Sequence, residues 1–335
     1  MTIKSRIALT LPNGATRNLA DVIAAAQRAE ALGYDDIWLS DTGNLDALTA
    51  SAMLLSQTDK LRIGIAVVPV SPRTPVALGA AAATLDQISP GRFILGIGSS
   101  SKTMIEGWHG LEFSKPLTRV RESLAILRQI FAGEKTHFDG EFLHSHNYRT
   151  SAAPVNIPIY VAALRANMLE MAAGLADGVI LNLFPQDALP KIMAHIRQGA
   201  EKAGRDPDSV EVVCRYQVAV TDDPAAARAR MRKGFVPYFA TSVYNQFLRW
   251  TGHEKAADDI LAGWQSGDRE RTATAFSDEL IDAIAIIGSA DECRARIHEY
   301  AAMGINTHII TPLAETPEEF EATLTAFAKG AFRFN

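Results

Sequence analysis

Residues 62–97 read RIGIAVVPVSPRTPVALGAAAATLDQISPGRFILGI, with two short apolar segments on either side of an alanine-rich one. The first segment, 62–68, is rich in β-branched residues and predicts a strand. Residues 92–97 predict a second strand, bounded by Gly91 and Gly98. Residues 76–88 have the apolar spacing and the alanine content of a helix. A strand, a helix and a strand in this order form a βαβ unit.

The same alternation continues in both directions along the chain. We expect further strands at 6–11, 36–39, 158–162, 178–182, 210–220 and 307–311, and helices at 19–32, 45–56 and 168–176. Eight strands that are each followed by helical sequence predict an α/β fold, the (β/α)8 TIM barrel. No linker rich in Pro, Gly and Ser divides the chain. We therefore prefer a single domain over residues 1–335 to a doubly wound open sheet in two domains.

Two intervals between strands are too long for one βα unit of about 30 residues. The intervals 92–158 and 210–307 predict insertions after strands 4 and 7, at about 99–157 and 222–288. The first insertion contains a helix at 117–131 and a hairpin-like stretch at 133–148, and the second is mostly helical over 224–287. Its aromatic residues, expected to cover a substrate pocket and to form an oligomer contact, are Phe235, Tyr238, Phe239, Tyr244, Phe247 and Trp250.

Composition limits the classes of partner. The chain has 33 Lys and Arg against 38 Asp and Glu, a formal net charge of −5 without a clustered basic run, so we expect no nucleic-acid partner. No stretch of about 18 apolar residues predicts a membrane span, and the first residues lack the apolar segment of a secretory signal. Cys214 and Cys293 stand far apart and form neither a disulfide framework nor a zinc spacing. We expect a cytoplasmic protein.

Functional residues of a barrel gather at the carboxyl ends of its strands. In this chain those positions hold small residues, amides and hydroxyls, and they are poor in acid–base groups, which suits a large cofactor with its own reactivity. The sharpest local signal is GIGSSS at 96–101, where glycine backbone and serine hydroxyls can approach an anion, although a turn without a ligand fits equally well. The positions are 12–14, 40–42, 67–69, 98–101, 163–165, 182 and 311–312.

Two other groups of residues are weaker candidates. His144 and His146 alternate near Glu141, but a third ligand at a suitable spacing is not evident, so we predict a polar hairpin and no metal site. We expect Cys214 to be a small core residue. Of its neighbours on the same strand, either Arg215 or Tyr216 faces the barrel interior, and the sequence does not determine which.

Several segments together resemble one family. ALGYDDIWLSD at 31–41, PGRFILGIG at 90–98 and PIYVAA at 158–163 are similar to the bacterial-luciferase-like superfamily. EGWHG at 106–110, with KPL at 115–117 and RE at 121–122, resembles the branch that uses the deazaflavin coenzyme F420, and the turn IGS at 287–289 also fits. The resemblance runs from residue 6 to about 312 and implies a (β/α)8 barrel with insertions.

This resemblance implies a cofactor at the carboxyl ends of the strands. Asp41 and Thr42 match the end of the second strand, beside the cofactor ring. Ala66 and Val67 match a bulge of the third strand, where family members have a non-prolyl cis peptide under the ring. The remaining cofactor-binding positions are Gly98, Ser99, Ser100 and Ser101 after the fourth strand, and Ala162, Ala163, Leu164 and Arg165 after the fifth, near the cofactor phosphate.

Two departures from the family pattern leave the cofactor open between F420 and FMN. Members of the F420 branch often have His where this chain has Thr42, and the loop that commonly reads ALGPK is ALRAN at 163–167. Arg165 in place of glycine either donates to the phosphate or narrows the site.

His109, beside Trp108, is the candidate proton donor near neutral pH, and its alternative is a packing or capping role. Glu106 is a candidate to orient His109. We interpret Asp41 as a hydrogen-bonding orienter of the reacting groups rather than as a base.

We therefore predict an oxidoreductase that transfers a hydride between coenzyme F420 and a small or medium organic substrate. The alternative on the same fold is an FMN-dependent monooxygenase that uses O₂ and reduced flavin from a separate reductase. A further alternative is a non-catalytic flavin-binding protein. Family members are often dimers, so we expect a homodimer by analogy.

Overall fold

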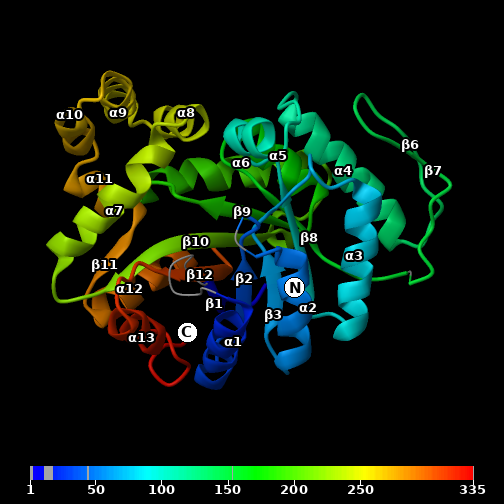
Figure 1. Cartoon of the computed structure of the whole chain (residues 1–335), viewed down its shortest axis with the longest axis horizontal. Helices are drawn as coiled ribbons and strands as arrows, with labels where there is room; N and C mark the ends of the chain where they lie inside the picture. The colour runs from blue at the N-terminus through cyan, green and yellow to red at the C-terminus, as the bar shows by residue number, and fades with distance from the viewer. Residues whose placement is uncertain (1–2, 11–17, 44, 153, 335) are drawn as a thin grey trace.

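The computed structural model describes residues 3–10, 18–43, 45–152 and 154–334. Parallel strands close into a barrel, in which each strand pairs with the next and β12 pairs with β1 (Figure 1). The predicted TIM barrel is confirmed. The eight barrel strands are β1 Arg6–Thr10, β2 Asp36–Leu39, β3 Arg62–Ile65, β5 Phe93–Gly98, β8 Ile159–Ala162, β9 Gly178–Asn182, β10 Glu211–Val220 and β12 Thr307–Pro312. The two-residue β4, Val68–Pro69, follows β3 and pairs with β5, while the expected strand end at Leu11 and the loop 12–14 lie outside the described residues.

Helices surround the barrel and begin at residues suited to that position. Asn18 and Thr74 accept hydrogen bonds from backbone N–H groups in the first turns of α1 and α3, and Ser289 and Glu292 form a capping box on α12. Gly33, with φ +83°, ends α1 in the left-handed conformation that favours glycine. The surrounding helices are α1 Leu19–Leu32, α2 Ala47–Gln57, α3 Pro75–Ile88, α4 Pro116–Phe131, α5 Ala166–Leu175, α6 Leu189–Lys202, α12 Ala290–Ala302 and α13 Pro317–Ala326.

The first insertion has two parts, because α4 packs between α3 and α5 as a helix of the barrel. Before α4 comes the π-helix Thr103–Trp108. After it comes a hairpin of β6 His137–Asp139 and β7 His144–His146, which projects from the right edge of the molecule in Figure 1. Short 3₁₀ turns, Gln186–Ala188 and Pro207–Ser209, flank α6.

The second insertion is helical, as expected, over most of its length. Its helices gather on the opposite side of the barrel from the hairpin, in yellow to orange in Figure 1: α7 Pro224–Phe239, α8 Ser242–Trp250, α9 Glu254–Ser266, α10 Arg269–Ala275 and α11 Asp278–Ile284. The prediction of helix as far as residue 287 is wrong. Ile286–Gly288 forms β11, because two β-branched isoleucines pair with the long end of β10 at Val218–Val220.

The inside of the barrel has three levels of side chains. Residues in a strand face alternate sides, and the middle level is a buried cluster of Ala8, Trp38, Ile94, Tyr160, Ile180, Val213 and Ile309. The level at the amino ends of the strands contains polar residues that precede a cluster member by two positions: Asp36, Glu211 and Thr307. The level at the carboxyl ends contains polar residues that follow a cluster member by two positions: Ser40, Asn182, Arg215 and Thr311. Both ends of the barrel are therefore polar.

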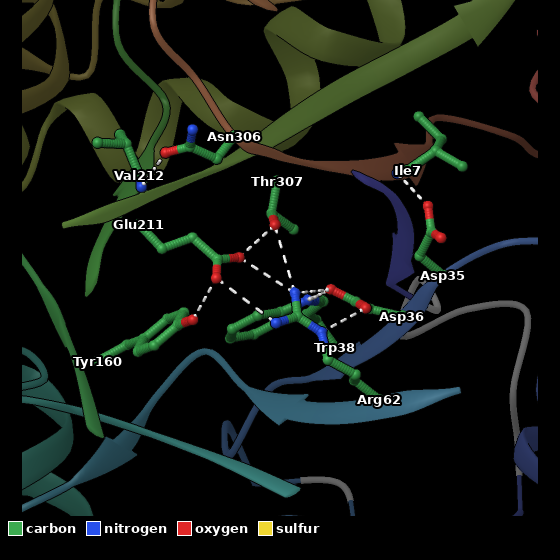
Figure 2. Close-up of polar contacts among 10 residues, drawn as sticks. All are labelled: Ile7, Asp35, Asp36, Trp38, Arg62, Tyr160, Glu211, Val212, Asn306 and Thr307. Carbon is green, nitrogen blue, oxygen red and sulfur yellow. Dashed lines mark hydrogen bonds and ion pairs between the residues drawn. The ribbon is translucent and has the colours of Figure 1, made fainter. Parts of the chain in front are cut away.

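The amino end is closed by an ion-pair network around Arg62 (Figure 2). Its Nη2 lies 2.6 Å from Asp36 Oδ2 and 3.1 Å from Glu211 Oε1, and its Nε donates to Asp36 Oδ1. Tyr160 and Thr307 donate hydroxyl hydrogen bonds to Glu211, each at 2.5 Å. Every charge in this group has a partner of opposite sign, so the group closes the barrel without an unpaired ion.

The pKa values at this end follow from burial and pairing. Burial raises the pKa of Asp36, whose side chain is 0% exposed. For Glu211, burial acts in the same direction, but Arg62 and the two hydroxyl donors outweigh it and lower the pKa. Burial acts to lower the pKa of Arg62, and the two carboxylates raise it overall. At neutral pH Arg62 and Glu211 are therefore both charged.

Strand β10 resolves the register that the sequence left open. Arg215 faces the barrel interior, whereas Cys214 and Tyr216 are buried against the surrounding helices. The Tyr216 hydroxyl lies 3.3 Å from His308 Nδ1 on the outer side of β12. Burial lowers the pKa of His308 to about 3. His308 is therefore a neutral core residue at pH 7.

None of the helices in the described part of the chain is both long and apolar enough to cross a membrane.

Candidate active site

The carboxyl ends of β3 and β5 approach each other unusually closely. The Ala66–Val67 peptide between β3 and β4 is cis, as the family resemblance implied. A Cβ at Gly96 would lie 1.8 Å from the Ile65 carbonyl oxygen, and one at Gly98 would lie 2.6 Å from Val67 Cγ2. The two glycines are therefore required by contact between neighbouring strands, whereas the sequence suggested only an approach to an anion.

The serines after β5 begin the first insertion. Ser101 accepts a hydrogen bond from Met104 N through its hydroxyl and one from Ile105 N through its carbonyl. Ser100 has φ +61°, and its hydroxyl lies 3.3 Å from Met104 Sδ. Ser99 donates to the Ser100 carbonyl. All three are partly exposed at the barrel mouth, so their hydroxyls remain accessible to a ligand.

The loop after β8 leads directly into α5. Arg165 is the last residue before this helix, and its carbonyl accepts hydrogen bonds from Met168 N and Leu169 N. The Arg165 side chain is exposed, and its Nη1 donates to Gln246 Oε1 of α8 at 2.9 Å. The helical insertion therefore reaches Arg165. The N–H groups of the first turn of α5 carry a partial positive charge at the same place.

The end of β2 is held by an arginine and covered by a tryptophan. Asp41 Oδ2 lies 3.3 Å from Arg73 Nη2, and Arg73 also pairs with Asp46. The ring of Trp108 lies over Gly43, where an added Cβ would be 3.3 Å from Cζ3 of the ring. Trp108 is 58% exposed, so one part of its ring is available to a ligand at the mouth.

His109 follows Trp108 and is exposed. His109 caps the carboxyl end of the π-helix, where its backbone N–H donates to the Glu106 carbonyl oxygen. The expected contact between the Glu106 carboxylate and the His109 ring is not among the side-chain contacts of the described residues. The Glu106 carboxylate instead lies 3.4 Å from Phe113 N and 3.7 Å from Lys102 Nζ. The short π-helix directs Glu106 toward its own insertion, a geometry that sequence spacing alone does not reveal. The proton-donor role of His109 stays a prediction.

The other side of the mouth, formed by β9, β10, β12 and the end of β2, is polar. Arg215 donates from Nε to Thr311 Oγ1 at 3.1 Å and from Nη1 to Ser40 Oγ at 3.2 Å. Asn182 Nδ2 donates to the hydroxyl of Tyr244, from α8, at 3.0 Å. Burial lowers the pKa of Arg215 and raises the pKa of Tyr244. This side thus combines one cation with neutral hydrogen-bonding groups.

Gln246 was not identified as a site residue from the sequence, and Tyr244 was named only as one of six aromatic residues expected to cover a substrate pocket. The aromatic character of the insertion was a signal, but helix packing decides which members reach the mouth. Tyr244 does so, whereas Phe239 and Phe247 are buried in apolar clusters. Tyr244 therefore reaches a strand-end residue, while the expectation that these aromatic residues cover a substrate pocket stays a prediction.

In the hairpin, His146 of β7 contacts residues of the facing strand β6. His146 Nε2 lies 2.9 Å from Asp139 Oδ1, and its ring contacts that of His137. Within the described ranges, no three His, Cys, Asp or Glu side chains form a group that could hold a metal ion.

An eight-stranded barrel with a cis peptide after its third strand and a glycine- and serine-lined mouth agrees with the resemblance drawn from the sequence. The chain belongs to the luciferase-like monooxygenase family, whose model matches residues 2–307.

Relatives and solved structures extend this assignment. A Mycobacterium tuberculosis protein assigned as a coenzyme F420-dependent oxidoreductase is 30% identical, over 88% of this chain and 90% of its own length. The 5,10-methylenetetrahydromethanopterin reductase of Methanolobus tindarius is 29% identical, over 88% and 91%.

Among solved structures, the F420-dependent tetrahydromethanopterin reductase of Methanopyrus kandleri has a TM-score of 0.81 at 21% identity, covering 97% of this chain and 98% of its own. The oxygenating constituent of 3,6-diketocamphane monooxygenase of Pseudomonas putida, in complex with FMN, has a TM-score of 0.70 at 18% identity, covering 99% and 98%. At these identities the two likenesses show a shared fold.

Proposed function

We propose that this protein is an F420-dependent oxidoreductase that transfers a hydride between coenzyme F420 and a small or medium organic substrate. One observation carries the proposal: Ile65 and Val67 at the end of β3 pack closely against Gly96 and Gly98 of β5, at a mouth lined by small and hydroxyl-bearing residues. Such a surface suits a flat cofactor ring and offers little acid–base machinery of its own. The names of the relatives that are 30% and 29% identical support the choice of F420.

The residues present fit such a cofactor. Ala66 and Val67 would lie under the ring, with Asp41 and Thr42 beside it. Gly98, Ser99, Ser100 and Ser101 would contact it from β5. Ala162, Ala163, Leu164 and Arg165, with the first turn of α5, would hold the phosphate, because backbone N–H groups and a guanidinium both bind anions. When bound, the deazaflavin supplies the hydride-carrying carbon.

The chain itself would orient the reactants. Arg73 holds the Asp41 carboxylate in a fixed position, from which it can accept a hydrogen bond. Trp108 would limit access of water from the side of β2, and His109 would provide a proton where the substrate requires one. Alignment of two reactants on a rigid barrel is the contribution that hydride transfer chiefly needs.

The test is a fluorescence titration of cofactor-free protein with F420 and, separately, with FMN. We expect dissociation constants in the micromolar range or below for F420 and no saturable binding of FMN. Arg165→Ala should weaken F420 binding by about ten-fold through loss of a charge-assisted contact. Arg28→Ala, on α1 away from the mouth, is the matched control and should leave binding unchanged. Binding of FMN alone, or of neither cofactor, would contradict the proposal.

An FMN-dependent monooxygenase is the second candidate, favoured by Thr42 at the position where F420 enzymes often have His and by the FMN-containing structural neighbour. It predicts oxygen consumption when reduced FMN and substrate are supplied. A protein that binds either cofactor tightly but turns over no substrate would instead support the non-catalytic alternative.

A further inference from the structure

Arg215 carries a positive charge that the described protein does not balance. Its hydrogen-bond partners are two neutral hydroxyls, those of Ser40 and Thr311. No carboxylate of the described residues lies within ion-pair distance of its guanidinium, and residues 1–2, 11–17, 44, 153 and 335 include no Asp or Glu side chain. A partly buried guanidinium without a counter-ion is costly to maintain, which indicates that a ligand supplies the missing charge.

The guanidinium has donors to spare and a fixed orientation. Arginine has five N–H groups, of which the Thr311 and Ser40 contacts use one on Nε and one on Nη1. One N–H on Nη1 and two on Nη2 remain, and Nη2 is not among the buried polar atoms without a partner. Two parallel N–H groups on one edge of a held guanidinium match the two oxygens of a carboxylate.

Arg215 lies across the mouth from the proposed cofactor surface. Strands β3, β5 and β8 carry that surface, whereas Arg215 stands on β10 between Asn182 of β9 and Thr311 of β12. Tyr244 of the helical insertion contacts Asn182, the neighbour of Arg215 on β9. A molecule bound at the mouth beside the cofactor ring would therefore have Arg215 on its far side.

We propose that Arg215 binds a carboxylate group of the substrate, so that the substrate class is small organic monoacids. This inference rests on the proposed function for the reaction, but not for the binding site itself. Among the described inward-facing residues of the carboxyl-end level, Arg215 is the single cation, so the site balances one negative charge. A dianionic phosphate would need a second cationic side chain at this site.

The test measures binding of matched acid and amide pairs, benzoate with benzamide and hexanoate with hexanamide, to protein loaded with F420. We expect wild-type protein to bind each acid at least about ten-fold more tightly than its amide. Arg215→Met should abolish this preference and leave F420 affinity within about two-fold of wild type, while Arg215→Lys should keep part of it. Arg28→Met is the control and should behave as wild type.

Further measurements separate this proposal from the proposed function. Ser40 and Thr311 hold Arg215 without any cofactor, so the preference for acids should persist in cofactor-free protein, read as a larger rise in melting temperature with benzoate than with benzamide. Failure of F420 to bind while this difference remains would overturn only the cofactor assignment. Equal binding of acids and amides by wild-type protein, or an unchanged preference in Arg215→Met, would overturn the role of Arg215.

If Arg215→Met does not fold, Thr311→Val serves as the second variant, because it keeps the charge and removes the acceptor that orients Nε. It should reduce the preference for acids by about three-fold, a smaller loss than removal of the charge. An unchanged preference in this variant would also count against the site.

Discussion

Arg62 and Arg215 both point into the same barrel, from opposite ends, and their surroundings differ. Arg62, at the amino end, is held between Asp36 and Glu211, and Tyr160 and Thr307 complete the network (Figure 2). Arg215, at the carboxyl end, donates its hydrogen bonds to two hydroxyls among the residues that the structure describes. Neighbouring strands supply the partners in both cases, so the difference lies in which residue types they present.

The amino end of the barrel is stabilised by paired charges, whereas the carboxyl end keeps a cation whose described partners are neutral. A fully paired cluster contributes rigidity and offers nothing to a ligand, because its donors and charges are used. An unpaired cation destabilises the protein alone but favours a bound anion. This division agrees with the general location of barrel active sites at the carboxyl ends of the strands.

The largest effect should come from Arg62→Met. The substitution removes the one cation that forms ion pairs with both Asp36 and Glu211 among the described residues, and breaking a buried pair in this way costs about 3–5 kcal/mol of unfolding free energy. Thermal and urea unfolding would measure it. Arg28→Met, which breaks the exposed pair with Glu321, should change the melting temperature little. If the melting temperature of Arg62→Met changes as little, water must hydrate the carboxylates at the amino end of the barrel.

A smaller effect is expected on the pH dependence of the unfolding free energy, through His308 on the outer side of β12. The folded pKa of His308 is lowered to about 3 from 6.5 by burial, so the unfolded chain binds the proton more readily. The stability contributed by neutral His308 is present above pH 6.5 and is lost as the pH falls toward 3. At pH 5 the loss is about 2 kcal/mol.

His308→Phe should therefore lose about 2 kcal/mol less than wild-type protein between pH 7.5 and 5, measured by urea unfolding at both values. The exposed His144→Gln is the control and should follow wild type. Identical pH dependence in His308→Phe would show that His308 is hydrated.

Tyr244→Phe tests the helical insertion over the carboxyl end. It removes the acceptor of the Asn182 amide, and loss of one such hydrogen bond costs about 1 kcal/mol. Thermal unfolding gives the measurement. Tyr238→Phe is the matched control from the same insertion. Because Tyr238 is 50% exposed, this variant should unfold as wild type does. Equal effects of the two variants would argue against a specific Tyr244–Asn182 contact.

The smallest effect, and the direct counterpart of Arg62→Met, is expected for Arg215→Met in cofactor-free protein. No carboxylate is left unpaired, so the unfolding free energy should stay within about 1 kcal/mol of wild type or rise above it. Urea unfolding of both variants side by side provides the comparison. A loss as large as that of Arg62→Met would mean that the two ends of the barrel do not differ in kind.

Much of the fold could be predicted from local sequence. The β-branched segments and alanine-rich helices alternate regularly, and intervals of excess length located the insertions. The boundary at Ile286–Gly288 could not be predicted, because a three-residue strand depends on the free edge of β10 rather than on its own sequence. Gly96 and Gly98 were singled out from the sequence for an approach to an anion, whereas their close contacts with Ile65 and Val67 could not be predicted.

The candidate site was predicted less completely. Resemblance led to Ala66 and Val67, whose cis peptide is present. Tyr244 and Gln246 lie about 60 to 80 residues from the strand-end residues they contact, and helix packing rather than local pattern brings them there.

The order of strands and helices follows from the sequence, because apolar periodicity and turn residues act over a few positions. The pairing of the two arginines follows instead from the closed barrel, which brings two carboxylates to Arg62 and two hydroxyls to Arg215. The carboxylates that pair with Arg62 lie 26 and 149 residues away, and the hydroxyls that hold Arg215 lie 96 and 175 residues away. Closure of the barrel sets these neighbours, since charge interactions depend on distance in space and on burial rather than on separation along the chain.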